Sequence, residues 1–252
     1  MILLLPLLAQ AATCPADIKA DPARAVETAT RWAASGGGAL ARQCLGLAFA
    51  AQEKWPEAAR SFEQGARDAE RAGNKAAALL WVQAANARLA GGEPRPAIAA
   101  LDAALVSGAL TGPVKGEARL DRARANVAAG DLPAARADLD EALKLVPDDP
   151  LAWLLSAALA RRMGVIERAQ ADIAEAMRRA PDDASVALEA GRIALAAGLA
   201  PAARVAWEGA VRAQPDSEAA KLALAELGRL GPTDQISEPP SSLGPGLRRD
   251  DK

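Results

Sequence analysis

The sequence predicts an all-α protein, a right-handed solenoid of about five helical hairpins. The first observation is a repeat of 34 residues: the stretch 147–181 can be laid over 181–215, so that Gly164 falls on Gly198 and both stretches end in proline. A fixed period of this length, with small residues and proline in phase, is typical of helical repeat arrays. The second observation is composition. Alanine, the best helix former, dominates, and no stretch alternates β-branched and polar residues as a strand would.

Composition also narrows the classes of function. The 252 residues are 51% hydrophobic and 25% charged, with a net charge of −2 and no histidine. Near-neutral charge argues against nucleic-acid binding, which needs a basic surface. Without histidine the chain lacks the commonest general base and the commonest metal ligand, and two cysteines are too few for an all-cysteine zinc site. We therefore expect no catalytic residue, no metal and no cofactor.

Residues 1–13 are predicted to be a signal peptide. The apolar run MILLLPLLAQAA is followed by small residues, as in an export signal, although no basic residue precedes it. A helix of about 12 residues covers roughly 18 Å, short of the roughly 30 Å hydrocarbon core, so we expect no stable membrane insertion. The alternative is a buried N-terminal helix. Lipidation of Cys14 is disfavoured because Thr13, rather than Gly or Ala, precedes it. We expect a periplasmic or secreted protein, with a cytoplasmic location as the alternative.

The segment 14–38 holds a cysteine and one expected helix. In an oxidising compartment Cys14 and Cys44 are expected to form a disulfide, closing a loop of about 30 residues and contributing roughly 3 kcal/mol. Two buried free thiols are the alternative. Asp21 and Pro22 suit the N-cap and first position of a helix, and three consecutive glycines follow its expected end.

The repeat array is expected from residue 39 to residue 230. Glycines such as Gly164 should take a left-handed C-cap, and aspartates such as Asp149 and Asp183 should cap the next helix rather than bind a metal. The last helix should cover the exposed end of the array. Residues 231–252 are rich in Pro, Ser, Gly and charge and are expected to be disordered. The expected units are 39–72, 78–111, 116–149, 150–183 and 184–217, followed by a capping helix to 230.

The residues that recur at equivalent positions of the repeat, here called columns, resemble those of the tetratricopeptide repeat family over about residues 39–230. Trp81 and Trp153 fill the early aromatic column, and Leu45-Gly46 and Gly191 match the Leu-Gly pair. Its tyrosine column keeps an aromatic residue only at Phe49. The resemblance implies steric roles for these residues and a partner-binding groove along the first helix of each pair. The second-helix pattern is filled by Ala58/Phe62, Ala97/Leu101, Ala135/Leu139, Ala169/Ile173 and Ala203/Trp207.

Family geometry assigns a mixture of aliphatic and donor side chains to the groove. Such a face suits an extended or helical protein segment with aliphatic and acidic residues. The alternative is that these are ordinary packing or solvated positions. The Lys and Asn clamp that chaperone-binding relatives use for C-terminal carboxylates is not matched, because Gln43 and Leu47 stand in its first places. The candidate partner-binding residues are Val82, Asn86, Leu89, Leu120, Arg124, Leu154, Arg161, Leu188 and Arg192.

The preferred function is a non-enzymatic scaffold or adaptor that binds another protein. The alternative is an enzyme-associated module or a cell-envelope enzyme without a recognisable catalytic motif. We interpret every Asp and Glu as part of a capping or solvated-face pattern, which disfavours this alternative. Whatever is particular to this protein should lie in residues that do not repeat, such as Leu154, Arg161 and Arg162.

Overall fold

The computed structural model describes residues 5–231, with side chains from Thr13 onward. Within these residues the chain forms thirteen α-helices and no strand, which confirms the predicted all-α class. The helices are α1 (Leu5–Ala20), α2 (Pro22–Ala34), α3 (Gly38–Ala50), α4 (Trp55–Arg71), α5 (Ala77–Ala90), α6 (Pro94–Val106), α7 (Gly112–Ala129), α8 (Leu132–Leu145), α9 (Pro150–Arg162), α10 (Ile166–Arg179), α11 (Ala184–Ala196), α12 (Ala200–Ala213) and α13 (Glu218–Leu230).

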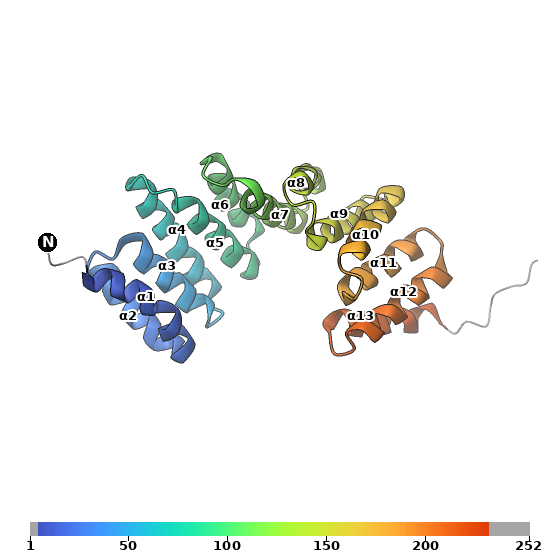
Figure 1. The fold of residues 1–252 in the computed structure, drawn as a ribbon, viewed down its shortest axis with the longest axis horizontal. Coiled ribbons are helices and arrows are strands. Elements are labelled where there is room, and N and C mark those ends of the chain that lie inside the picture. The colour runs from blue at the N-terminus through green and yellow to red at the C-terminus, as the bar shows by residue number, and fades with distance from the viewer. Residues whose placement is uncertain (1–4, 232–252) are drawn as a thin grey trace, which may run out of the picture.

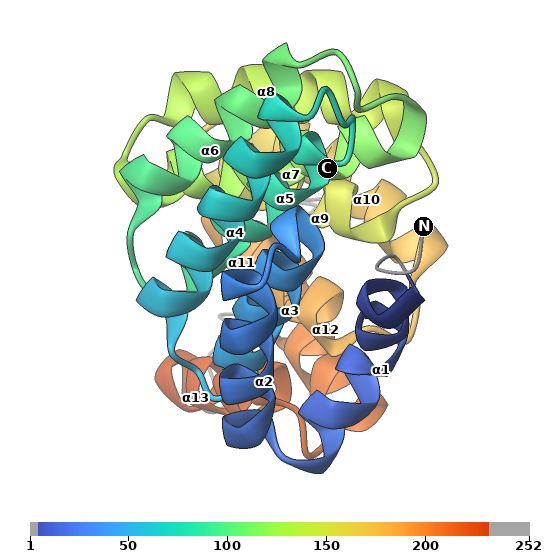
Figure 2. The ribbon, with the colours of Figure 1, turned by 90° about the vertical axis from the view of Figure 1, so that its left-hand side faces the viewer.

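The helices follow one another along an arch (Figure 1). Five antiparallel pairs, from α3–α4 to α11–α12, form the array, and α13 packs against α12 and α11 at its end. The first helices α5 and α7 lie on the inner side of the arch, beneath α6 and α8. Figure 2, in which the left-hand side of Figure 1 faces the viewer, shows α1 and α2 beside α3. The predicted solenoid is therefore confirmed, with two helices before the first pair.

The chain ends differ in part from the expectation. Helix α1 runs to Ala20, so it crosses the expected signal-peptide boundary at residue 13; an N-terminal helix was the alternative to the signal peptide. Removal of residues 1–13 stays a prediction; residues 1–4, and the side chains of residues 5–12, lie outside the description. The tail expected to be disordered lies outside the described residues from 232 onward. Among residues 5–231, no helix combines the length and apolar character needed to cross a bilayer.

Aspartates and glycines set the helix ends as the sequence predicts. Asp21, Asp149 and Asp183 each accept a hydrogen bond from the amide N–H two residues further on, at 3.0, 2.9 and 2.7 Å. These bonds satisfy amides that have no partner inside the helix. Gly164 and Gly198 follow α9 and α11 with φ of 76° and 77°, where a side chain would be strained. Asp21, Asp149 and Asp183 are therefore helix caps.

Glycine on one helix and an aromatic ring on the next hold two of the pairs together. A Cβ atom on Gly46 would lie 2.5 Å from the Phe62 ring, and one on Gly191 only 2.3 Å from Nε1 of Trp207. Trp207 is 1% exposed, and its Nε1 donates to the Leu188 carbonyl at 3.1 Å. The first and second helices can approach this closely only because one of them carries no side chain at the contact.

The two early tryptophans do less packing than the family resemblance implies. Trp153 is half-buried, donates from Nε1 to the Pro147 carbonyl at 2.7 Å, and carries the Arg179 guanidinium 5.2 Å from its ring centre. Trp81 is also half-buried and donates to Glu70 at 2.6 Å. These half-buried rings contact residues at the junctions between successive pairs, with one edge toward the core and the other toward water.

A disulfide fastens the N-terminal helices to the array. The structure joins Cys14 of α1 to Cys44 of α3, with Cα atoms 6.0 Å apart. Both cysteines are buried in one cluster with Trp32 and Leu45. The expected pairing is therefore present, and it connects α1 directly to the first repeat.

The glycine–tryptophan contact gives a matched pair of stability predictions. Replacing Gly191 with Ala drives a methyl group into Trp207 and should lower the free energy of unfolding by about 1–3 kcal/mol, the cost of overpacking. Gly228 in α13 faces open space, so Gly228→Ala should raise stability by about 0.5–1 kcal/mol through backbone entropy. Urea unfolding measures both. A Gly191→Ala variant as stable as the parent protein would contradict the packing role.

Candidate functional site

Three hollows follow one another between the first helices of the array. The first lies between α5 and α7, the second between α7 and α9, and the third between α9, α11 and α13, with volumes of about 350, 240 and 500 Å³. Together we call this surface the groove. Its lining residues are Asn86, Leu89, Ala90, Arg124 and Ala128 in the first hollow, Ala123, Arg124, Val127, Leu139, Leu155, Ala158, Leu159 and Arg162 in the second, and Arg161, Arg192, Leu195, Ala196, Trp207 and Glu226 in the third.

The expected aliphatic residues divide into two groups. Val82, Leu89 and Leu154 are partly buried beside the core clusters, and Leu89 also lines the first hollow. Leu120 and Leu188 are only 4% and 5% exposed and belong to the core itself. These two leucines support the groove from within and offer almost no surface to a partner.

The polar candidates in the first hollow form a small cluster with Asp121. Asn86 and Arg124 are exposed, and both make side-chain hydrogen bonds to this carboxylate. Arg124 Nη1 lies 3.3 Å from Asp121 Oδ1, and the arginine side chain is 55% exposed. Burial nevertheless raises the pKa of Asp121, because the two bonds do not fully replace the lost water.

The candidate arginines of the third hollow are already paired. Arg161 Nε lies 2.6 Å from Oε1 of Glu189, a carboxylate whose side chain is only 7% exposed. Arg192 lies 3.7 Å from the same Glu189 and 3.4 Å from Glu226 of α13. This ladder of alternating charges links α9, α11 and α13. Its arginines are engaged inside the protein, so they are poorly placed to bind a partner carboxylate.

The interpretation of every acidic residue as a cap or a solvated side chain is wrong for three of them. Asp138, Asp172 and Glu189 are 3%, 6% and 6% exposed. Asp138 and Asp172 stand 34 residues apart, next to the buried Leu139 and Ile173, on second helices. Their shared place in the repeat, beside a core residue, is the signal from which their burial was predictable.

The buried Asp138 organises a cluster between α6, α7 and α8. It accepts hydrogen bonds from Arg119, Arg122 and Asn126 at distances between 2.6 and 3.2 Å. Arg122 also reaches Asp102 on α6 at 2.6 Å. The bond to Asp138 raises the pKa of Arg122. A buried carboxylate with this many donors is structural, since each of its oxygens is already occupied.

Asp172 anchors the equivalent cluster one unit further on. It accepts a hydrogen bond from the buried Ser156 hydroxyl and lies 3.3 Å from Arg168, which also bonds to Asp140 on α8. The cluster therefore joins α8, α9 and α10. No group of three or more His, Cys, Asp or Glu side chains arranged to hold a metal ion occurs in the part of the chain that the structure describes.

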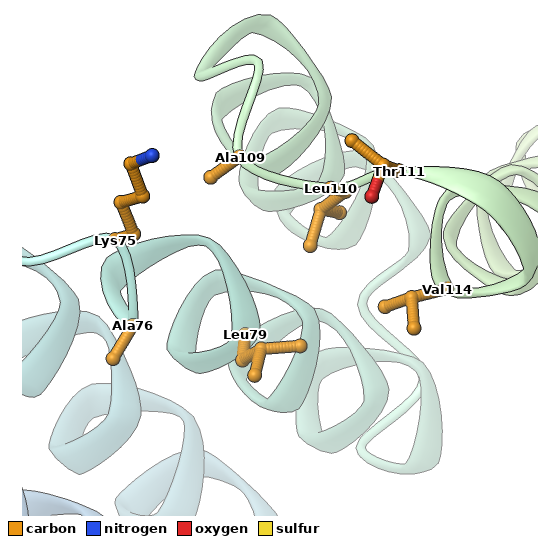
Figure 3. A pocket seen from close by; sticks show the side chains of 7 residues that line it. All are labelled: Lys75, Ala76, Leu79, Ala109, Leu110, Thr111 and Val114. Atoms are coloured by element: carbon orange, nitrogen blue, oxygen red, sulfur yellow. The ribbon is translucent and has the colours of Figure 1, made fainter.

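A further hollow of about 310 Å³ opens at the long turn between the second and third units (Figure 3). Leu79, Leu110 and Val114 surround the space, and Lys75 stands at its rim. Leu79 and Val114 are 49% and 43% exposed. The turn lacks the closing proline of the regular units, and the wider junction leaves these side chains uncovered. This hollow lies at the starts of α5 and α7, away from the residues that line the groove.

The stacked hairpins and their groove define a helical-repeat scaffold of the kind that binds other proteins. The chain belongs to the tetratricopeptide repeat family, because the family model for this repeat matches residues 82–150 and 154–218, together more than half of the sequence. This fold is generally a non-catalytic interaction module. No curated protein matches the sequence.

Solved structures share the fold at low sequence identity. One is YrrB, described as a tetratricopeptide protein with an unusual peptide-binding site: 17% identical, TM-score 0.58, with 80% of this chain and 100% of that chain covered. PilF of Pseudomonas aeruginosa is 14% identical with a TM-score of 0.60, covering 83% and 99%. BtubC from P. vanneervenii is 16% identical with a TM-score of 0.64, covering 95% and 99%. Likeness at this identity shows the fold alone.

The buried acidic clusters predict unequal effects of two aspartate substitutions. Asp138→Ala removes a carboxylate that is 4% exposed and leaves Arg119 with no partner there, so unfolding should become easier by about 3 kcal/mol. Asp102→Ala, the matched control, removes a side chain that is 52% exposed and should cost about 1 kcal/mol or less. Guanidinium unfolding curves compare the two. Equal effects would show that Asp138 is not the centre of the cluster.

The raised pKa of Asp121 predicts a pH-dependent gain from Asp121→Asn. A carboxyl whose pKa is raised by folding stabilises the protein below its unfolded pKa, and this contribution is lost as the pH rises through the folded value. The ordinary value is 3.8. Asp121→Asn should therefore be more stable than the parent at pH 7, with the gain disappearing as the pH falls below 3.8. Melting temperatures across this range measure the difference. A gain that is independent of pH would contradict the desolvation.

Proposed function

We propose that this protein is a non-enzymatic adaptor that holds a segment of another protein in its groove and works outside the cytoplasm. The observation that carries the proposal is the row of three hollows across four first helices, which mixes aliphatic walls with arginine and asparagine side chains. An elongated surface of this kind suits an extended or helical segment with several contact points. Membership of the tetratricopeptide repeat family supports the same proposal.

The buried acidic residues do not favour the enzymatic alternative. A general acid or base needs a carboxyl group that can exchange a proton with a substrate in an open cleft. Asp138 and Asp172 are instead enclosed and bonded to neighbouring side chains. Glu189 is buried as well and is held between Arg161 and Arg192.

Site-specific photocrosslinking tests the groove. Ala128 is exposed and lines the first hollow, whereas Ala99 is exposed on α6, a second helix outside the hollows. A photoreactive amino acid at residue 128 should label one discrete partner in the native host, and the same group at residue 99 should not. The labelled partner segment should contain aliphatic and acidic residues. Equal labelling from both positions, or labelling from 99 alone, would contradict the adaptor proposal.

The export proposal rests on residues 1–13 and on the disulfide. Oxidised cysteines are usual in the periplasm and outside the cell and rare in the cytosol. Protein purified from its host should begin between Ala12 and Cys14, and Cys14 and Cys44 should react with a thiol reagent only after reduction. Mass spectrometry of the intact chain and of its N-terminal peptide reads out both properties. An intact Met1 together with free thiols would contradict export.

A further inference from the structure

A small residue lines the second hollow at a position where the other units carry larger side chains. Asn86, Arg124, Ala158 and Arg192 occupy equivalent places on α5, α7, α9 and α11, and Ala158 is the smallest of the four. On α9 this position lines a space of about 240 Å³, and the neighbouring α7 and α11 carry arginine there. The space is smaller than the roughly 300–1,000 Å³ of small-molecule sites. It is suited to a single side chain.

The floor and walls of this hollow are apolar. Val127 and Leu155 are partly buried, and beneath them lie Leu139 and Leu159, which are 1% and 2% exposed. A guest side chain would therefore bury its surface against aliphatic groups of one core cluster. Burial of an aliphatic side chain in such a place is favourable, whereas burial of an unpaired polar group is not. The fitting guest is leucine, isoleucine or methionine.

The charged residues of this hollow are all positive. Arg124 and Arg162 line it, both are exposed, and no Asp or Glu belongs to the lining. Arg162 makes no ion pair within residues 13–231, and Arg124 holds only the exposed pair with Asp121, which contributes little to stability. The neighbouring hollow differs, because Arg161 and Arg192 are already paired there. The available positive charge of the groove is thus concentrated around Ala158.

We propose that the hollow at Ala158 is the specificity anchor of the groove. It receives one aliphatic side chain of the partner segment, and Arg162 and Arg124 bind carboxylates of acidic residues within one or two positions of that side chain. Guanidinium–carboxylate bonds add direction to the apolar contact, so the site selects a short acidic-aliphatic motif over either feature alone. This inference rests on the proposed function, since it names the motif that the groove recognises.

A random octapeptide display library, panned on the full chain, supplies the probe. Enriched peptides should share Leu, Ile or Met with Asp or Glu within two positions. The best peptide, labelled with a fluorophore, is then compared with two versions of itself, one with alanine for the aliphatic residue and one with amides for the acids. Each version should bind at least tenfold more weakly. Enriched peptides that are basic, or that lack the aliphatic residue, would overturn the anchor.

Variants of the protein locate the peptide. Ala158→Leu fills the hollow and Arg162→Gln removes its unpaired charge; each should raise the Kd of the labelled peptide at least tenfold, equal to about 1.4 kcal/mol. Arg212→Gln is the matched control, because Arg212 is an exposed arginine on α12 outside the hollows, and it should change the Kd less than twofold. Circular dichroism and urea midpoints check that each variant folds. Arg162→Gln keeps the test decisive where Ala158→Leu does not fold.

The outcomes separate the anchor from the adaptor. A peptide that photocrosslinks at residue 128, yet binds Ala158→Leu and Arg162→Gln as tightly as the parent, overturns the anchor and leaves the adaptor standing. A peptide that crosslinks at residue 99 and not at 128 overturns both proposals. If the peptide with amides in place of its acids binds Arg162→Gln as tightly as the unmodified peptide does, that arginine pairs directly with the peptide. If the losses of binding free energy from Arg162→Gln and from the amide peptide add, the acids contact another part of the surface.

Discussion

The close approach of neighbouring helices is the constraint on which the rest of the structure depends. Each pair must bury its apolar face against the next, and two helices reach the short end of the usual range of about 8–10 Å between axes only where small residues meet. Gly191 against Trp207 shows the most demanding form of this contact, and the fully buried Ala169 and Ala203 show the commoner one. Small residues make most of the contacts between helices, and the whole chain accordingly has only seven aromatic residues.

The same constraint explains why charged groups enter the middle of the array. Alanine-rich contacts bury little area per residue, and register between units must come partly from directional bonds. The clusters around Asp138 and Asp172 supply such bonds in the third and fourth units, and each reaches the neighbouring pair through an arginine, Arg122 to Asp102 and Arg168 to Asp140. Glu189 does so between α9 and α11. A consequence for function is that arginines near these acids serve the fold, and only those beyond their reach are available to a partner.

The period of 34 residues was sufficient to predict the hairpins, the capping role of Asp149 and the left-handed Gly164, because these depend on contacts within a few residues. The availability of the groove arginines was not predictable in this way. Arg161 meets Glu189 and Arg192 meets Glu226 across 28 and 34 residues, so each pair forms only once the superhelix has brought its units into place. The same holds for Leu120 and Leu188: their columns face the groove in the family pattern, but neighbouring helices cover them here.

What distinguishes this chain from its family therefore comes from departures from the repeat. A column that reads Asn86, Arg124, Ala158 and Arg192 keeps the backbone of every unit alike while changing what each unit presents to the groove. At α9 the small side chain of Ala158 lines a hollow beside two arginines. Repeat proteins can acquire specificity by such substitutions because each unit contacts only its neighbours. A binding site can then arise at one junction without disturbing the others.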